Sequence, residues 1–137
     1  MCFVGSVDRR MYALDLASGK QHWNATTGGG IEGSATVAEG KVFFGSNDGT
    51  LYCVDLSTGR QRWRYETHGG IEGKPAVHND TVYIGSRDGF LYAVDSDTGA
   101  LEWSFDAEGE IFGGPTVDNT GSTVVVGAGD CVVAVAI

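Results

Sequence analysis

The sequence is short of proline, of positive charge and of long apolar runs, and each shortage narrows what the protein can be. Two prolines stand beside 22 glycines in 137 residues, which favours many tight turns over flexible low-complexity linker. Nine Lys and Arg against 18 Asp and Glu give a formal net charge of -9, which repels phosphate backbones and anionic lipid surfaces. No stretch approaches the roughly 18 apolar residues of a membrane span. We therefore expect no nucleic-acid partner and no membrane span.

Cysteine is also scarce, and its three copies form no recognisable pattern. Cys2, Cys53 and Cys131 are odd in number and none lies close to another, so the sequence indicates neither a disulfide framework nor a zinc site. Residues 1–5 show no signal-peptide pattern. With 42% hydrophobic and 20% charged residues, the chain has the composition and length of one domain with a buried core.

A repeat with a period of 40 residues organises the whole chain. The same residue recurs three times at this spacing at each of the five positions given below, and after a two-residue insertion near Gly121 a fourth copy opens at Val124 and keeps Asp130. Because repeats of this length indicate propellers or solenoids, the repeat is the main evidence for the fold. The recurring residues are Asp8, Asp48 and Asp88, Tyr12, Tyr52 and Tyr92, Asp15, Asp55 and Asp95, Gly19, Gly59 and Gly99, and Trp23, Trp63 and Trp103.

Each period contains four short strand signals separated by Gly or Asx turns, which is the strand count of one propeller blade. In the second copy the predicted strands are residues 34–38, 42–45, 51–55 and 61–66. Residues 51–54 and 91–94 are apolar at odd and even positions alike, so both faces of these strands must be covered. Blades stacked on either side provide that cover, whereas no 3.6-residue apolar period supports a helical solenoid.

One motif within the repeat has a physical reason of its own. The pattern D-x-x-x-G-x-x-x-W occupies residues 15–23, 55–63 and 95–103. The aspartate can accept hydrogen bonds from the amides of the turn, and the glycine permits a positive φ. The tryptophan can pack on the neighbouring blade and donate its indole N–H to a backbone carbonyl. We therefore interpret these nine residues as structural docking residues.

This motif resembles the tryptophan-docking motif of the pyrroloquinoline-quinone (PQQ) type, or quinoprotein-like, β-propellers. The resemblance implies an all-β fold, a partial propeller of four-stranded antiparallel blades with about 3.5 repeats. Strands are ordered from A, innermost, to D, outermost. The blades are then strands B to D of blade 1 in residues 1–27, blade 2 in 28–67, blade 3 in 68–107 and strands A to C of blade 4 in 108–137.

Two bare ends follow from that arrangement. They predict a head-to-tail homodimer that closes a ring of seven or eight blades, with a fragment of a longer protein as the alternative.

Residues suited to chemistry are few. Ser6 and its repeats follow a turn glycine without a partner histidine, and the three histidines fall at different points of the repeat, so neither a catalytic triad nor a metal site is predicted. Quinoprotein dehydrogenases of the resembled family hold PQQ with calcium, often beneath a disulfide between adjacent cysteines. This chain has no adjacent cysteines and no tryptophan outside the docking motif. We expect no cofactor and no catalysis.

Loops on one face of a propeller are its usual binding surface, and the strand order places two sets of loops on the same rim. The candidate binding residues on this rim are Arg9, Asn47, Arg87, Phe112, Glu32 and Glu72. We predict a non-enzymatic scaffold or sensor module for a protein or peptide. The alternative is a fragment of a PQQ-dependent quinoprotein dehydrogenase whose cofactor site lies outside this chain. The resemblance implies a periplasmic or extracellular location.

Overall fold

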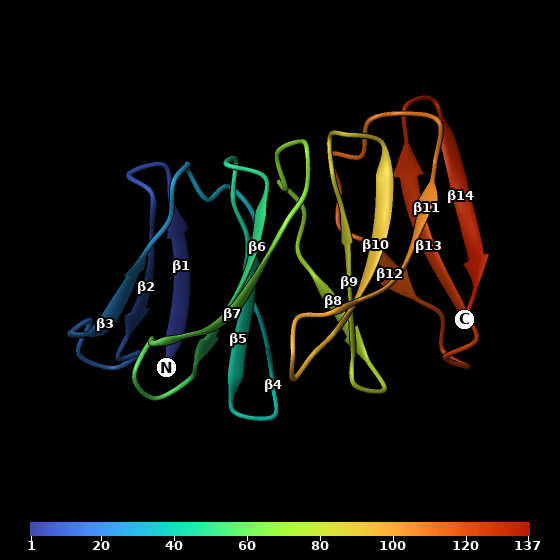
Figure 1. Ribbon diagram of the computed structural model, residues 1–137. Coiled ribbons are helices and arrows are strands. Elements are labelled where there is room, and N and C mark those ends of the chain that lie inside the picture. Colours follow the sequence, from blue (N-terminus) through green and yellow to red (C-terminus); the bar gives the residue numbers. More distant parts are fainter.

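The computed structural model describes residues 1–137 and contains strands but no helix. Its fourteen strands form four separate antiparallel sheets, which stand side by side from the amino-terminal to the carboxy-terminal end (Figure 1). No segment has the helical length and apolarity that crossing a bilayer demands. The predicted all-β class and the blade arrangement are therefore confirmed, and we call the four sheets blades 1 to 4 in chain order.

Each blade is a meander of neighbouring strands. Blade 1 comprises β1 (Cys2–Ser6), β2 (Arg10–Leu14) and β3 (Gln21–Thr26). Blade 2 comprises β4 (Thr36–Ala38), β5 (Lys41–Gly45), β6 (Thr50–Asp55) and β7 (Gln61–Glu66). Blade 3 comprises β8 (Ala76–His78), β9 (Thr81–Gly85), β10 (Phe90–Asp95) and β11 (Leu101–Asp106). Blade 4 comprises β12 (Thr116–Val117), β13 (Thr123–Ala128) and β14 (Cys131–Ala136).

The first strand of blade 2 is shorter than predicted. It begins at Thr36, because the preceding segment lies against the backbone of the next blade rather than in a sheet. A side chain at Gly33 would place its Cβ 2.4 Å from the Glu72 carbonyl oxygen. The loop is therefore fixed by contacts between blades, which the pattern within one repeat does not encode.

The core consists of three apolar layers, one between each pair of adjacent blades. The layer between blades 2 and 3 contains Phe43, Trp63 and Ile84. Strands β5 and β9 are buried along their entire length because they are covered from both sides. The outer faces of blades 1 and 4 have no such cover, and Val132 on β14 is 77% exposed. The outer faces of the end blades therefore present apolar side chains to solvent.

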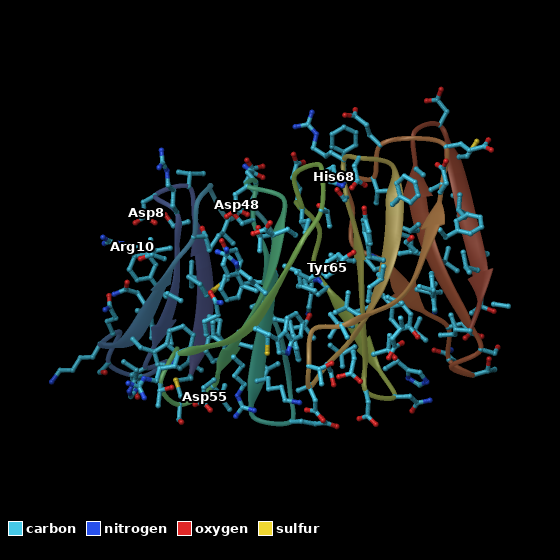
Figure 2. The ribbon with its side chains drawn as sticks, viewed as in Figure 1. Asp8, Arg10, Asp48, Asp55, Tyr65 and His68 are labelled. Carbon is cyan, nitrogen blue, oxygen red and sulfur yellow. The ribbon has the colours of Figure 1, made fainter.

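The loops lie at two opposite edges of the array. The turns β1–β2, β5–β6, β9–β10 and β13–β14 share one edge with the connections formed by residues 27–35, 67–75 and 107–115. We call this edge, uppermost in Figure 1, the upper rim. Figure 2 shows Asp8, Asp48 and His68 on the upper rim and Asp55 at the opposite edge. The two sets of loops that the strand order predicted on one rim therefore do lie at the same edge.

Candidate functional site

The docking-motif aspartates organise the turns at the edge opposite the upper rim. Asp55 Oδ1 accepts hydrogen bonds from the backbone N–H groups of Ser57 at 2.9 Å and Thr58 at 3.1 Å. Arg62 donates to its other oxygen at 2.8 Å. These hydrogen bonds lower the pKa of Asp55, and the one from Arg62 has the largest effect. Asp15 and Asp95 hold their turns in the same way.

The tryptophans of blades 1 and 2 form latches to the next blade. The indole N–H of Trp23 donates to the Leu56 carbonyl at 2.9 Å, and that of Trp63 donates to the Ser96 carbonyl at 3.0 Å. Each ring lies against the motif glycine of the following blade, since a Cβ at Gly59 would lie 2.5 Å from ring carbons of Trp23. The glycine therefore permits the positive φ and also makes room for the ring.

Trp103 differs from the other two tryptophans. It is only partly buried, and its indole N–H donates no hydrogen bond within the chain. Residues 116–137 of blade 4 contain no Asp-x-x-x-Gly turn that could receive it. Gly19 is a motif glycine with no tryptophan ring against it, since a Cβ there would meet no atom within 4 Å. Within residues 1–137, therefore, the Trp103 indole has no carbonyl partner and no tryptophan ring lies against Gly19.

The aspartates of the upper rim join neighbouring blades. Asp48 Oδ2 accepts the Tyr52 hydroxyl at 2.6 Å and the Gly28 N–H of blade 1's outgoing loop at 2.8 Å. Asp88 does the same with Tyr92 at 2.7 Å and the His68 N–H at 3.0 Å. Burial raises the pKa of both aspartates, but these hydrogen bonds outweigh it and leave the pKa lowered.

Five of the six predicted rim residues pair or cluster. The Asn47 side-chain amide donates to Glu32 Oε1 at 2.7 Å. Arg87 Nη1 donates to Glu72 Oε1 at 3.4 Å, and its guanidinium carbon lies 5.1 Å from the centre of the Phe112 ring. Both polar pairs join residues 15 positions apart. That constant spacing is a signal in the sequence that could have indicated the pairing.

The structure adds one residue to this group and separates another. Glu110 Oε1 lies 3.8 Å from Arg87 Nε, so two carboxylates flank the guanidinium. Sequence reasoning missed Glu110, although it lies two residues from Phe112. Arg9 makes no ion pair and no side-chain hydrogen bond. Its φ is 73°, and the equivalent Gly49 and Gly89 also have positive φ, of 85° and 91°, so its position follows from the turn. We call Arg87, Glu72, Glu110 and Phe112 the rim cluster.

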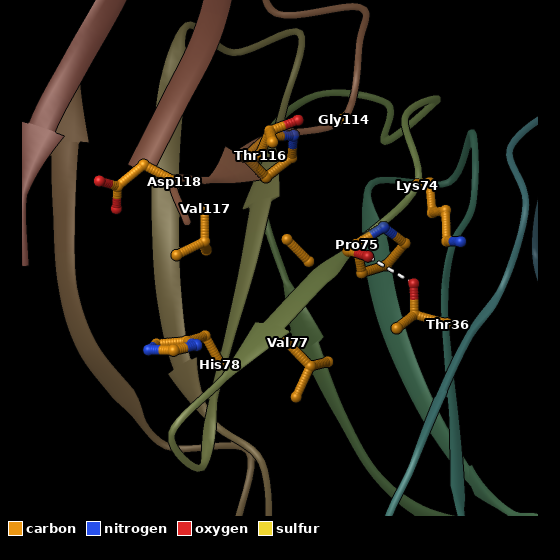
Figure 3. A pocket seen from close by; sticks show the side chains of 11 residues that line it. Thr36, Lys74, Pro75, Val77, His78, Gly114, Thr116, Val117 and Asp118 are labelled. Carbon is orange, nitrogen blue, oxygen red and sulfur yellow. Dashed lines mark hydrogen bonds between the residues drawn. The ribbon is translucent and has the colours of Figure 1, made fainter. Parts of the chain in front are cut away.

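A shallow groove of about 560 Å³ lies along the inner strands of blades 3 and 4 (Figure 3). Lys74, His78 and Asp118 supply its charged or titratable groups, and the Thr36 hydroxyl donates to the Pro75 carbonyl beside it at 2.5 Å. No group of three or more His, Cys, Asp or Glu side chains anywhere in the chain is placed to hold a metal ion. The indoles of Trp23 and Trp63 are occupied in latches. Without such a group of metal ligands, the residues present do not fit a calcium ion held beside PQQ.

Comparisons with known proteins agree with this geometry. No curated protein matches the sequence. The crystal structure of BamB from Moraxella catarrhalis is similar over 92% of this chain and 39% of its own, with 29% identity and a TM-score of 0.80. The computationally designed Ika4 protein is 23% identical over 98% of this chain and 84% of its own, with a TM-score of 0.85.

The quinohemoprotein alcohol dehydrogenase from Comamonas testosteroni is 21% identical over 92% of this chain and 27% of its own, with a TM-score of 0.79. The chain thus spans about two fifths of the BamB structure and less of the dehydrogenase. A family model described as "Outer membrane protein assembly factor BamB" matches residues 1–136. The chain therefore belongs to this BamB-like family of PQQ-type repeat propellers.

Proposed function

We propose that the chain is a non-enzymatic propeller scaffold that binds a protein or peptide at the rim cluster. The observation that carries this proposal is the Phe112 ring, which is 49% exposed on the upper rim beneath the Arg87 guanidinium. Arginine and aromatic side chains dominate the energetics of protein interfaces. Because Glu72 and Glu110 hold the guanidinium in place, little side-chain entropy is lost when a partner docks.

The charges around the ring define the partner. Glu72, Glu110 and the overall charge of -9 favour a segment with basic residues, and Phe112 favours an apolar or aromatic residue within it. The family's description as an outer-membrane assembly factor supports a protein partner. It also supports a periplasmic or extracellular location, which we include in the proposal.

Selection from a displayed library of random 12-residue peptides tests the proposal. We expect the selected peptides to combine basic with aromatic residues and to lose about tenfold or more in affinity on Arg87→Ala and on Phe112→Ala. Arg9→Ala is the matched control, because Arg9 is an exposed arginine of the same rim without side-chain partners. Peptides that bind all three variants as tightly as the unmodified chain would contradict the rim cluster as the site.

The second candidate function is part of a quinoprotein dehydrogenase, which the similarity to the quinohemoprotein alcohol dehydrogenase favours. Likeness at 21% identity supports the fold alone, and no three His, Cys, Asp or Glu side chains here are placed together to hold a metal ion. Calorimetric titration with PQQ and calcium is expected to give no saturable heat. A micromolar affinity would favour the dehydrogenase instead.

A second copy of the chain is the occupant we propose for the bare end faces. Tyr12 and Leu14 alternate with the buried Met11 on β2, and they stand at the repeat positions of Tyr52 and Val54, which pack on blade 1 from blade 2. The bare face of blade 1 is therefore one half of a blade junction. The opposite half lies on blade 4, so the contact is head to tail, and we propose that it closes a ring rather than an open filament.

Light scattering after size exclusion, over a range of dilutions, measures this assembly. A dimer that resists dilution supports closure by two chains, which together supply eight sheets. A monomer that unfolds cooperatively would contradict it.

A further inference from the structure

The junction between blades 3 and 4 contains a cavity that the other two junctions lack. Its volume is about 550 Å³, and it lies between the end of β11 and the turn from β13 to β14. We call it the junction socket. Its walls include Phe105, Ala107, Glu108, Ala128, Asp130 and Val133. Cavities of this size are in the range of small-ligand sites.

A tyrosine ring fills the corresponding place between blades 2 and 3. Tyr92 lies opposite Ile84 in the β9–β10 ladder, as Val133 lies opposite Val126 in the β13–β14 ladder. The Tyr92 ring centre is 5.6 Å from that of Tyr65, and Tyr65 is the repeat equivalent of Phe105. With valine in place of Tyr92, the Phe105 ring has no such partner and is 41% exposed.

Two further differences between the repeats make part of the socket wall apolar. Between blades 2 and 3 the hydroxyls of Thr67 and Ser86 lie 3.1 Å apart, and both contact the Gly69 carbonyl. The equivalent residues of the next junction are Ala107 and Ala128, both buried. The polar bridge is therefore absent, and small apolar side chains take its place.

A carboxylate at the mouth has lost its partners. Asp88 accepts both the Tyr92 hydroxyl and the His68 N–H. The turn of blade 4 contains only Gly129 and Asp130 between the paired residues of its strands, and the N–H of Glu108, the equivalent of His68, bonds to Asp106 instead. The Asp130 carboxylate accepts no hydrogen bond in the structure, and it lines the cavity together with Asp106 and Glu108.

We propose that the junction socket binds a para-hydroxyphenyl group whose other end is positively charged. The ring takes the place that Tyr92 takes between blades 2 and 3 and packs at an angle against Phe105, as the Tyr92 ring packs against Tyr65. Its hydroxyl donates to Asp130 at the mouth. The carboxylates of Asp106 and Glu108 in the same lining favour a ligand with a positive rather than a negative net charge. Shape, apolar walls and acidic mouth all favour this one chemistry. The site is independent of the rim cluster.

Tyramine, titrated into ¹⁵N-labelled protein, is the probe. We expect saturable shifts of the backbone amides in residues 105–110 and 127–134, with an affinity in the millimolar range. Phenethylamine lacks the hydroxyl and is expected to bind about threefold or more weakly, because it cannot donate to Asp130. The absence of saturable shifts in these two segments, in the unmodified chain, would overturn the proposal.

Two tyrosine variants of β14 form a matched pair. Val133→Tyr fills the socket and is expected to abolish tyramine binding and raise the midpoint of thermal unfolding. Val132→Tyr places the same side chain on the opposite, bare face of the strand and is expected to leave tyramine binding intact. Equal tyramine affinity in both variants would show that the ligand does not occupy the socket.

Discussion

Alanine substitution of the motif glycines separates the two roles of that residue. Gly19, Gly59 and Gly99 have nearly the same backbone conformation, with φ of 72°, 72° and 74°. They differ in surroundings: an added Cβ would lie 2.5 Å from the Trp23 ring at Gly59 and 2.7 Å from the Trp63 ring at Gly99, but would meet nothing within 4 Å at Gly19. Alanine at Gly19 therefore measures the cost of the backbone conformation alone.

The expected magnitudes follow from that geometry. A left-handed conformation costs alanine about 1–2 kcal/mol relative to glycine at each of the three sites. Carbon atoms normally approach to about 3.5–4.0 Å, so the rings of Trp23 and Trp63 must shift, which adds about 1–3 kcal/mol of overpacking. Gly59→Ala and Gly99→Ala should thus lower the free energy of unfolding by about 2–5 kcal/mol.

Urea unfolding of the three variants tests the reasoning. A difference of about 2 kcal/mol corresponds to roughly 8 °C in the thermal midpoint of a chain of this size. In a Trp63→Ala background the penalty of Gly99→Ala should fall to the value at Gly19, because the ring is gone. Equal losses at all three glycines, or an unchanged penalty without Trp63, would refute the latch.

Three further predictions concern single side chains. Trp63→Ala should lower the free energy of unfolding in urea by about 3–5 kcal/mol. Trp103→Ala should lower it by less than half of that, since Trp63 is latched and Trp103 is not; equal losses would contradict this. Hydrogen bonds lower the pKa of Asp118 to about 2, and the one from the Thr120 hydroxyl has the largest effect. The stabilisation by Asp118 is therefore complete above the unfolded pKa of about 3.9 and is lost as the pH falls towards 2. Asp118→Asn should reduce the loss of stability at acid pH, measured by circular dichroism, and an unchanged loss would argue against this. Burial raises the pKa of the Cys53 thiol to about 12, so Cys53 should react with a thiol reagent only on unfolding. The exposed Cys131 should react at once. A single reaction rate for Cys53 and Cys131 in the folded chain would contradict this prediction.

Features that repeat within one blade were predictable from the sequence. The strands, the turns and the edge occupied by each loop depend on residues close together in the chain, and the 40-residue period records them three times. Asn47 and Glu32 were placed on one rim for this reason, and the structure joins them. The partner of a latch was harder to predict, because the distance from Trp63 to Gly99 depends on how adjacent sheets pack.

The features that break the repeat could not be predicted in the same way. The loss of a latch at Trp103 depends on what blade 4 presents to it, and the junction socket depends on Val133, Ala107 and Ala128 coming together from three segments. Each of these residues is an ordinary small apolar side chain when considered alone. Only the comparison of corresponding places in successive junctions shows that a ring and two hydroxyls are missing.

The separation of the sheets has a consequence for how such a chain can change in length. Hydrogen-bonded strand ladders run only within a blade, and each apolar layer involves two neighbours. A duplicated or deleted stretch that begins and ends at the same point of the repeat therefore restores every junction, as between Trp23 and Trp63. A stretch of any other length puts a tryptophan opposite the wrong turn. Whole blades are thus the units by which this architecture can grow or shrink.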